Sequence, residues 1–401
     1  MEMVSGSSEA GTGPAPSARA AGAARLAGLA SGLGLGDRRG VCVDAFGAMT
    51  ASWGTATAAQ LAESDVSSDG SPMEFALGLD DDPALQFAVE ALQPGDCPVD
   101  RIVSARATMA GLVRRYGTDE RRWAQVADLY LPEKPATEHV AMFGAEVRRS
   151  GAPQFKVWFY PAVAGPERAA ELCERGLAAV GLGAAWPAVS AHMARGDRLD
   201  RPVMFSLDLA ADPEARVKLY FRHYATDADG LAQLMAPYPG FAAAPVRRFC
   251  RTMLDEAAAD LSAQPPVTCL SFTGARPTTP GGATVYLPMW TYAPDDEAVR
   301  HRMRAALSAC GRSSELYERA LREVASRPPM AGRGIHNYVA WRPGPGRPRL
   351  KAYFSPELRH KDPMPRYALE GQEGQEGQEG QEGQEGQAER EGREGLEGLE
   401  R

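Results

Sequence analysis

The sequence predicts an α+β fold in which a ten-stranded antiparallel β-barrel is surrounded by an outer ring of α-helices. Three observations lead to this prediction: strand-like segments occur in five pairs, a short turn joins the members of each pair, and helical patterns separate the pairs. A short turn makes each pair antiparallel. A sheet of ten strands tends to curl, and closure into a barrel of repeated αββα units removes its exposed edges.

The strand pairs follow from runs of alternating side chains bounded by turn residues. They are expected near residues 72–80 and 83–91, 138–148 and 154–161, 202–210 and 215–224, 266–273 and 282–290, and 334–342 and 348–355. Helical patterns are expected over 100–116, 119–130, 166–195, 227–263, 294–308 and 312–326. Ten strands make a barrel wider than an eight-stranded ligand carrier, so we expect it to hold a ligand.

The two ends of the chain differ in composition from the body. Residues 1–19 are rich in Gly, Ser, Pro and Ala and are predicted to form a disordered leader. Residues 20–366 are predicted to form a single barrel domain, and residues 367–401, which repeat Glu-Gly-Gln, a disordered tail. The net charge of −8 is matched by the eleven Glu and three Arg of residues 370–401. The body is therefore nearly neutral, which argues against nucleic acid or a membrane surface as a partner.

The cysteines and the start of the chain bear on the cellular compartment. The six cysteines are scattered and form no CxxC pair, which is typical of reduced thiols in a cytoplasmic protein. The first residues lack the basic start and apolar core of a signal peptide, and no apolar run approaches the roughly 18 residues of a membrane helix. We expect a cytoplasmic protein that is a monomer or a weak homodimer.

Several predicted strands carry cations and aromatic residues on one face and apolar residues on the other. The residues on the polar face are Lys156 and Trp158, then Arg216, Lys218 and Tyr220, then Lys351 and Tyr353, with Tyr286 on a strand that has no cation. Helices must cover the apolar face, so the polar face should point into the barrel. Buried cations need anionic partners, and few acidic residues share these faces. We expect a diphosphate ligand, although a solvated sheet face is the alternative for any single strand.

The aromatic residues indicate what happens to the diphosphate. If the carbon–oxygen bond of an allylic diphosphate ionises, the faces of Tyr and Trp stabilise the allyl cation and exclude water. The sequence has no DDxxD motif, so side-chain cations are expected to hold the diphosphate; Mg²⁺ is not essential and no cofactor is required. Glu74 shares the inward face of its strand with the small residues Ala76 and Gly78 and could accept the N–H of an indole. The alternative is a strand-end Glu that reaches solvent.

In their order and spacing these segments resemble the dimethylallyltryptophan synthase family of indole prenyltransferases, particularly its actinobacterial branch. The resemblance covers residues 40–360 and is carried by Pro72-Met73-Glu74-Phe75, Phe155-Lys156-Val157-Trp158-Phe159, Arg216-x-Lys218-x-Tyr220, Val285-Tyr286-Leu287-Pro288 and Lys351-x-Tyr353. It implies the prenyltransferase barrel and a role in secondary metabolism such as alkaloid biosynthesis. The implied reaction is a metal-independent Friedel–Crafts alkylation that moves a dimethylallyl or longer prenyl group to tryptophan or a tryptophan-derived metabolite.

The resemblance also implies roles for individual residues. Glu74 would hold the indole N–H, the diphosphate would be bound by Lys156, Arg216, Lys218 and Lys351, and the cation would be shielded by Tyr220, Tyr286, Tyr338 and Tyr353. Two positions depart from the family pattern, because Gln86 replaces an Arg at the diphosphate and Trp158 replaces a Tyr. These changes leave the length of the donor open. The alternatives are a non-catalytic barrel that carries an aromatic or anionic small molecule, and a prenyltransferase of the same fold that acts on phenols or tyrosine.

Overall fold

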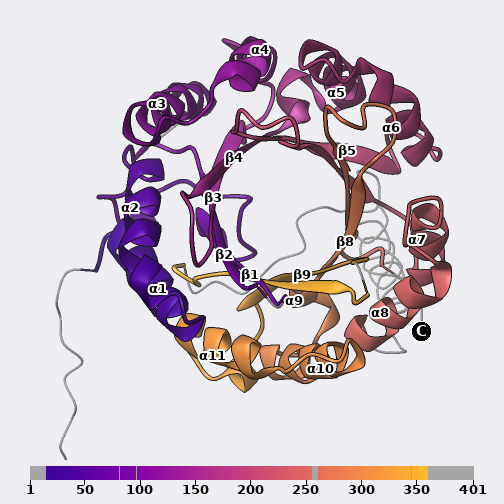
Figure 1. Cartoon of the computed structure of the whole chain (residues 1–401). Coiled ribbons are helices and arrows are strands. Elements are labelled where there is room, and N and C mark those ends of the chain that lie inside the picture. Colours follow the sequence, from indigo (N-terminus) through magenta and orange to yellow (C-terminus); the bar gives the residue numbers. More distant parts are fainter. Residues whose placement is uncertain (1–14, 81, 96, 255–260, 345, 360–401) are drawn as a thin grey trace, which may run out of the picture.

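Ten strands form one closed antiparallel barrel, which a ring of helices surrounds (Figure 1). The computed structural model describes residues 15–80, 82–95, 97–254, 261–344 and 346–359. The strands are β1 (Met73–Gly78), β2 (Ala84–Glu90), β3 (Ala141–Val147), β4 (Gln154–Phe159), β5 (Asp200–Asp208), β6 (Val217–His223), β7 (Val267–Phe272), β8 (Gly282–Pro288), β9 (His336–Arg342) and β10 (Arg349–Phe354). Each strand pairs with its neighbour in sequence, and β1 pairs with β10 to close the barrel. The predicted fold class is confirmed.

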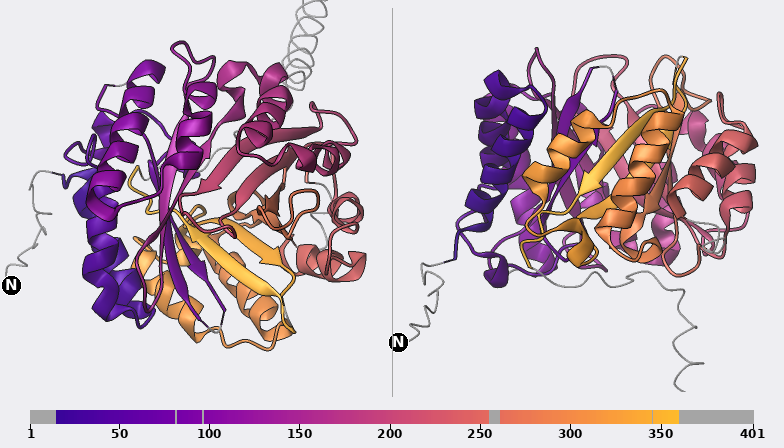
Figure 2. Two further views of the ribbon diagram at one scale, coloured as in Figure 1. Left: turned by 45° about the horizontal axis from the view of Figure 1, so that its top comes forward. Right: turned by 90° about the horizontal axis from the view of Figure 1, so that it is seen from below.

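Two helices precede the first hairpin and the others lie between successive hairpins, and together they cover the outside of the barrel (Figure 2). They are α1 (Ala18–Gly32), α2 (Arg39–Met49), α3 (Pro98–Tyr116), α4 (Arg121–Tyr130), α5 (Ala169–Ala179), α6 (Trp186–His192), α7 (Ala228–Met235), α8 (Ala243–Leu254), α9 (Met289–Tyr292), α10 (Asp296–Ala309) and α11 (Glu315–Val324). In these described ranges no helix combines the length and the apolar character that a bilayer span needs. All six cysteines are free thiols.

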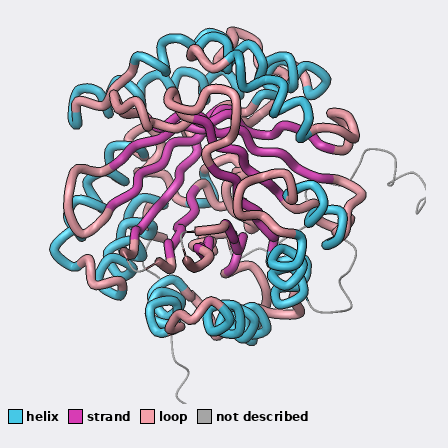
Figure 3. The backbone as a smooth tube through the Cα atoms, turned by 45° about the vertical axis from the view of Figure 1, so that its right-hand side comes forward, coloured by secondary structure: helices cyan, strands magenta, loops and turns pink. Residues whose placement is uncertain are grey.

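The helices form a layer outside the strands of the barrel (Figure 3). The hydrophobic core lies between the two layers. The outward-facing residues Phe75, Phe143, Phe159, Phe205 and Phe221 are fully buried in this layer. Because side chains alternate along a strand, burying one face against helices leaves the other face for the inside of the barrel. Each buried Phe contributes about 1.5–3 kcal/mol relative to an exposed one. The apolar pattern therefore fixes which residues point inward.

The first two helices were not expected from the sequence. Ser17 caps α1 by accepting a hydrogen bond from the backbone N–H of Ala20 (3.2 Å). In the middle of α1, Gly22 lies so close to Phe46 and Met73 that an added Cβ would come within 2.6 Å of both side chains. The Ala- and Gly-rich composition, which resembles that of a disordered segment, is thus an adaptation to close packing against the sheet.

The predicted boundaries of the domain meet the described residues only in part. Helix α1 begins at Ala18, inside the segment 1–19 that was predicted to be a leader. The remainder of that leader, up to residue 14, lies outside the described residues. The predicted tail, 367–401, also lies outside them, so the three-part division stays a prediction.

Buried carboxylate–imidazole pairs lie at one end of the barrel, outside its lumen. Three such pairs are joined by hydrogen bonds: Glu90 with His139 (2.7 Å), Asp200 with His223 (2.8 Å) and Asp296 with His336 (2.8 Å). The second pair continues through the hydroxyl of Thr268 to His192 and then to the hydroxyl of Tyr238, each step 2.7 Å long. These polar groups satisfy one another in an otherwise apolar layer.

This network predicts an acid-sensitive stability. Burial, reinforced by the neighbouring His223, lowers the pKa of His192 to about 3. A histidine whose pKa is depressed on folding stabilises the protein fully above its ordinary pKa of about 6.5, and that stability is lost as the pH falls toward 3. We expect the Tm to fall between pH 6.5 and pH 4, and the fall to be shallower in His192→Leu, whose Tm at pH 7 is lower. Thermal unfolding by circular dichroism measures both, and a slope unchanged from wild type would contradict the assignment. The exposed His301 supplies the control, His301→Ala.

Candidate active site

The inside of the barrel is a cavity of about 900 Å³. The structure places every residue singled out from the sequence on its wall: Glu74, Gln86, Lys156, Trp158, Arg216, Lys218, Tyr220, Tyr286, Tyr338, Lys351 and Tyr353. The strand registers order them along the barrel. On β1, Gly78 lies opposite Lys351 and Ala76 lies opposite Tyr353, while Glu74 lies one step further on. At about 3.3 Å per residue, Glu74 is roughly 13 Å along the strand from the level of Lys351.

Cations gather at one end of this cavity, which we call the cation end. It contains Lys156, Arg216, Lys218 and Lys351. Burial lowers the pKa of Lys218 to about 8, and burial also holds the pKa of Lys351 well below its usual range, with Lys156 adding repulsion. Concentrating like charges in a buried place costs free energy, and an anionic ligand would recover it.

Arg342 was missed by the sequence analysis and adds to this charge. It lines the cavity from the end of β9 and lies directly across from Arg349 on β10. Burial lowers its pKa, with Arg349 and Arg216 contributing repulsion. Arg349 is paired with Asp80 at 3.5 Å. The alternation of side chains in β9, which puts Tyr338 and Arg342 on one face, is the signal that would have found it.

Aromatic rings form a belt next to the cation end. The ring centroids of Tyr220 and Tyr286 are 5.9 Å apart, and those of Tyr286 and Tyr353 are 5.8 Å apart. Trp158 packs against the same cluster. This belt, made of Trp158, Tyr220, Tyr286 and Tyr353, lines the lumen with aromatic rings, and the face of such a ring stabilises a positive charge held against it.

Glu74 marks the other end of the cavity. Its carboxylate accepts a hydrogen bond from the side-chain amide of Asn337 (2.9 Å). Asn337 is fixed in turn by the backbone N–H of Ser68 (3.0 Å) and the hydroxyl of Ser67 (3.2 Å). Burial raises the pKa of Glu74 to about 8, and the bond from Asn337 opposes this only in part. The structure thus holds the half-buried side chain of Glu74 in a fixed geometry on the cavity wall.

Asn337 could not be recognised from the sequence. It lies at a β-bulge, where the register between β9 and β10 shifts between Ala352 and Phe354. A bulge reverses the alternation of side chains, so a pattern-based assignment puts Asn337 on the wrong face of the strand.

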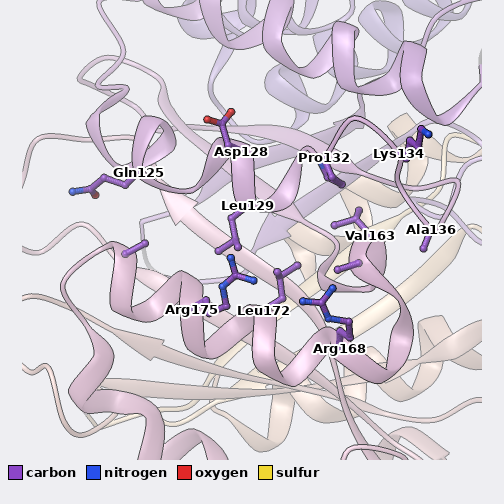
Figure 4. Close-up of a pocket in the computed structure, with 12 residues that line it drawn as sticks. Gln125, Asp128, Leu129, Pro132, Lys134, Ala136, Val163, Arg168, Leu172 and Arg175 are labelled. Carbon is purple, nitrogen blue, oxygen red and sulfur yellow. The ribbon is translucent and has the colours of Figure 1, made fainter.

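A second hollow, of about 620 Å³, lies outside the barrel between α4 and α5 (Figure 4). Arg168 and Arg175 line it, and both are paired with Glu171, at 3.1 and 3.4 Å. Leu129 and Leu172 form part of its wall. The charges of both arginines are paired with Glu171, so the lumen is the stronger candidate for the active site.

Comparison with known proteins identifies the family. A sequence model described as tryptophan dimethylallyltransferase matches residues 41–236. The whole barrel is similar to 5-dimethylallyltryptophan synthase from Streptomyces coelicolor, with 26% identity, a TM-score of 0.77, and coverage of 86% of this chain and 99% of that one. It is also similar to 6-dimethylallyltryptophan synthase from Micromonospora olivasterospora, solved in complex with DMASPP and Trp, with 28% identity, a TM-score of 0.78, and coverage of 87% and 99%. The chain belongs to the tryptophan dimethylallyltransferase family.

This result confirms the family predicted from the sequence and its actinobacterial branch. AnaPT from Neosartorya fischeri shares the fold alone, at 14% identity and a TM-score of 0.68 over 86% of this chain and 93% of that one. The two departures from the family pattern, at Gln86 and Trp158, can now be described in the structure.

Gln86 is engaged by a carboxylate that the sequence analysis missed. Its amide donates a hydrogen bond to Glu146, which also contacts Lys156 (3.4 Å) and Arg148 (2.7 Å). Although burial opposes it, the attraction of Lys156, Lys351 and Arg148 lowers the pKa of Glu146 to about 2.

Asp208 supplies a second acid at the cation end, 2.6 Å from Arg216 and 3.8 Å from Lys218. Two acids thus lie beside Lys156, Arg216, Lys218 and Lys351, and they offset the charge of these four cations only in part. Both acids follow the alternation of their strands, Glu146 with Met142 and Gly144 and Asp208 with Met204 and Ser206, and could have been found from it.

The ring of Trp158 packs closely against Gly144 on the neighbouring strand β3. A Cβ added to Gly144 would lie 2.7 Å from the Trp158 ring and 2.8 Å from the backbone oxygen of Phe87. We expect Gly144→Ala to push the indole of Trp158 into the lumen and to lower kcat/KM for a prenyl diphosphate by about tenfold, a change of about 1.4 kcal/mol. Steady-state kinetics with five- and ten-carbon donors measure it, and the longer donor should lose more. Equal kinetics for wild type and Gly144→Ala would show that the ring has room elsewhere.

Proposed function

We propose that this chain is an aromatic prenyltransferase that moves a dimethylallyl or longer prenyl group from its diphosphate to an indole ring. The acceptor is tryptophan or a tryptophan-derived metabolite. One observation carries the proposal: a single cavity holds cations at one end, an aromatic belt beside them and a hydrogen-bond-accepting carboxylate beyond the belt. The cations suit a diphosphate, the aromatic belt suits an allyl cation, and the carboxylate suits an indole N–H. Family membership supports the same reaction.

In the proposed reaction, the carbon–oxygen bond of the prenyl diphosphate breaks and its electron pair stays on the diphosphate. Lys156, Arg216, Lys218 and Lys351 stabilise the added negative charge, and the belt stabilises the allyl cation and excludes water. A ring carbon of the indole then forms a bond to the cation. Glu74, which accepts the N–H, stabilises the positive charge that spreads over the ring. Loss of a proton from the alkylated carbon, for which the released diphosphate is a competent base, restores aromaticity.

The roles of these residues and the independence from a metal are parts of the same proposal. Arg342 joins the diphosphate-binding set, and Gln86 acts through Glu146. No cofactor is required, and the enzyme works in the cytoplasm as a monomer or a weak homodimer. Within the described ranges, no group of three or more His, Cys, Asp or Glu is arranged to hold a metal ion.

Mass spectrometry tests the reaction directly. Purified protein is incubated with L-tryptophan and dimethylallyl diphosphate in the presence of EDTA. A product heavier by one dimethylallyl group would support the reaction class, the donor and the metal independence together. A product seen only with geranyl diphosphate, or only with a phenol, would correct the donor or the acceptor. If no product formed with any donor, indole or phenol while the prenyl diphosphate still bound, the result would favour a non-catalytic carrier.

A further inference from the structure

Glu146 is a carboxylate in a place where a diphosphate is expected to bind. It lines the cavity from β3 and is only 5% exposed. Three polar neighbours fix it: Arg148 at 2.7 Å, Lys156 at 3.4 Å, and the amide of Gln86. Part of the hydrogen-bonding capacity of Lys156 and Gln86 is therefore directed at Glu146 rather than at the lumen.

Asp208 differs from Glu146 in its placement. It approaches Arg216 and Lys218, at 2.6 and 3.8 Å, but is not part of the cavity wall that these two cations form. Its contacts suit a counter-ion that fixes the direction of the two cations. The two acids lie on the same inward face of the sheet, but Glu146 forms part of the cavity wall and Asp208 does not, so we expect them to affect an anion in the lumen differently.

We propose that Glu146 is a specificity-determining residue that weakens the hold of the cation end on pyrophosphate, so that the product leaves after each turnover. This inference rests on the proposed function. Glu146 competes with phosphate oxygens for Lys156 and Gln86. Its negative charge also repels an anion that binds beside it. Asp208, by contrast, is a positioning residue that strengthens anion binding.

The charge balance of the reaction explains why the product is affected more than the donor. When the carbon–oxygen bond breaks, its electron pair stays on the diphosphate, which gains one unit of negative charge as the prenyl cation departs. Repulsion by Glu146 grows with that charge. Its presence therefore weakens the binding of pyrophosphate more than that of the prenyl diphosphate. The substitution of Gln86 for a cation acts in the same direction.

Calorimetric titration with inorganic pyrophosphate tests the inference on the full chain, without any aromatic acceptor. Glu146→Gln keeps the shape of the side chain and removes its charge, and we expect it to lower the Kd of pyrophosphate by about tenfold or more. Asp208→Asn should raise that Kd, since Arg216 and Lys218 lose their orientation. Glu146→Asp, which keeps the charge, should stay close to wild type. In steady-state kinetics, Glu146→Gln should lower the inhibition constant of pyrophosphate more than the KM of the donor.

The outcomes separate this inference from the proposed function. If neither wild type nor Glu146→Gln binds pyrophosphate, the cation end is not a diphosphate site and the proposed function fails. If wild type binds it and Glu146→Gln binds it equally or more weakly, Glu146 merely supports the cations and the inference is overturned. Unfolding curves of each variant show whether it is folded, and Glu146→Asp provides a second reading should Glu146→Gln be unstable.

Discussion

Glu74→Gln is expected to lower kcat by about 100-fold or more while leaving the Kd of the prenyl diphosphate near its wild-type value. Such a loss is in the range found when a catalytic proton acceptor or a charge-stabilising group is removed. The glutamine fits the same space and can still accept the bond from Asn337, so what is lost is the negative charge facing the indole. Single-turnover kinetics with L-tryptophan and titration with the donor measure the two quantities. An unchanged kcat would show that Glu74 has no part in the chemistry.

The pH dependence of this variant provides a sharper test. The pKa of Glu74 is raised to about 8 in the empty cavity. The ionised fraction, and with it kcat/KM for the acceptor, should rise with pH and level off above about 8 in wild type, whereas Glu74→Gln should lack this rise.

Whereas kcat/KM rises with pH, the contribution of Glu74 to the stability of the fold should fall with pH. A carboxyl whose pKa is raised on folding stabilises the protein at low pH, and that stability is lost as the pH rises through 8. At pH 9 the Tm of Glu74→Gln should therefore exceed that of wild type. The same Tm measurement shows whether the variant is correctly folded.

Lys156→Met and Lys351→Met should both weaken donor binding by about 10–100-fold, since each removes a charged hydrogen bond worth about 1.5–3 kcal/mol. Their effects on the free energy of unfolding should differ in sign. Lys156 is the ion-pair partner of Glu146, so its loss leaves a buried carboxylate with less compensation and should cost about 3 kcal/mol. Burial, and after it repulsion from Lys156 and other cations, depresses the pKa of Lys351. Its loss removes a charge that is costly to bury and should not destabilise the protein.

Chemical denaturation and donor titration of the two lysine variants measure these effects. The double variant Lys156→Met/Glu146→Gln should recover most of the lost stability, because it removes the carboxylate left without its partner. If Lys156→Met and Lys351→Met were equally stable, Glu146 would not depend on Lys156.

The barrel could be predicted because its determinants are local. Each hairpin is specified by its turn residues and by the alternation of its strands, as in β3 and β4, where Phe143 and Val157 face the helices and Lys156 faces the lumen. The same alternation revealed most of the site, since the helices must cover the apolar face of each strand and the cations then point into the barrel. Strand pairing and inward direction therefore follow from the sequence pattern alone.

The features that escaped prediction depend on contacts between distant segments. Helix α1 is defined by the close approach of Gly22 to Phe46 and Met73, which composition does not reveal. Asn337 reaches Glu74 only because a bulge turns it inward. The pairing of Glu146 with Lys156 joins neighbouring strands, and although both lie on inward faces, only the register shows that they meet.

The pairing of β1 with β10 has a consequence for the synthesis of the chain. The strand that carries Glu74 is the first of the ten strands to be made, and its neighbour on one side, the strand of Lys351 and Tyr353, is the last. Until then the nascent sheet has two open edges, which are templates for unwanted pairing with other chains. Closure of the barrel by the pairing of β1 with β10 is therefore all-or-none. A chain that stops short of Phe354 has neither a closed barrel nor a complete cavity.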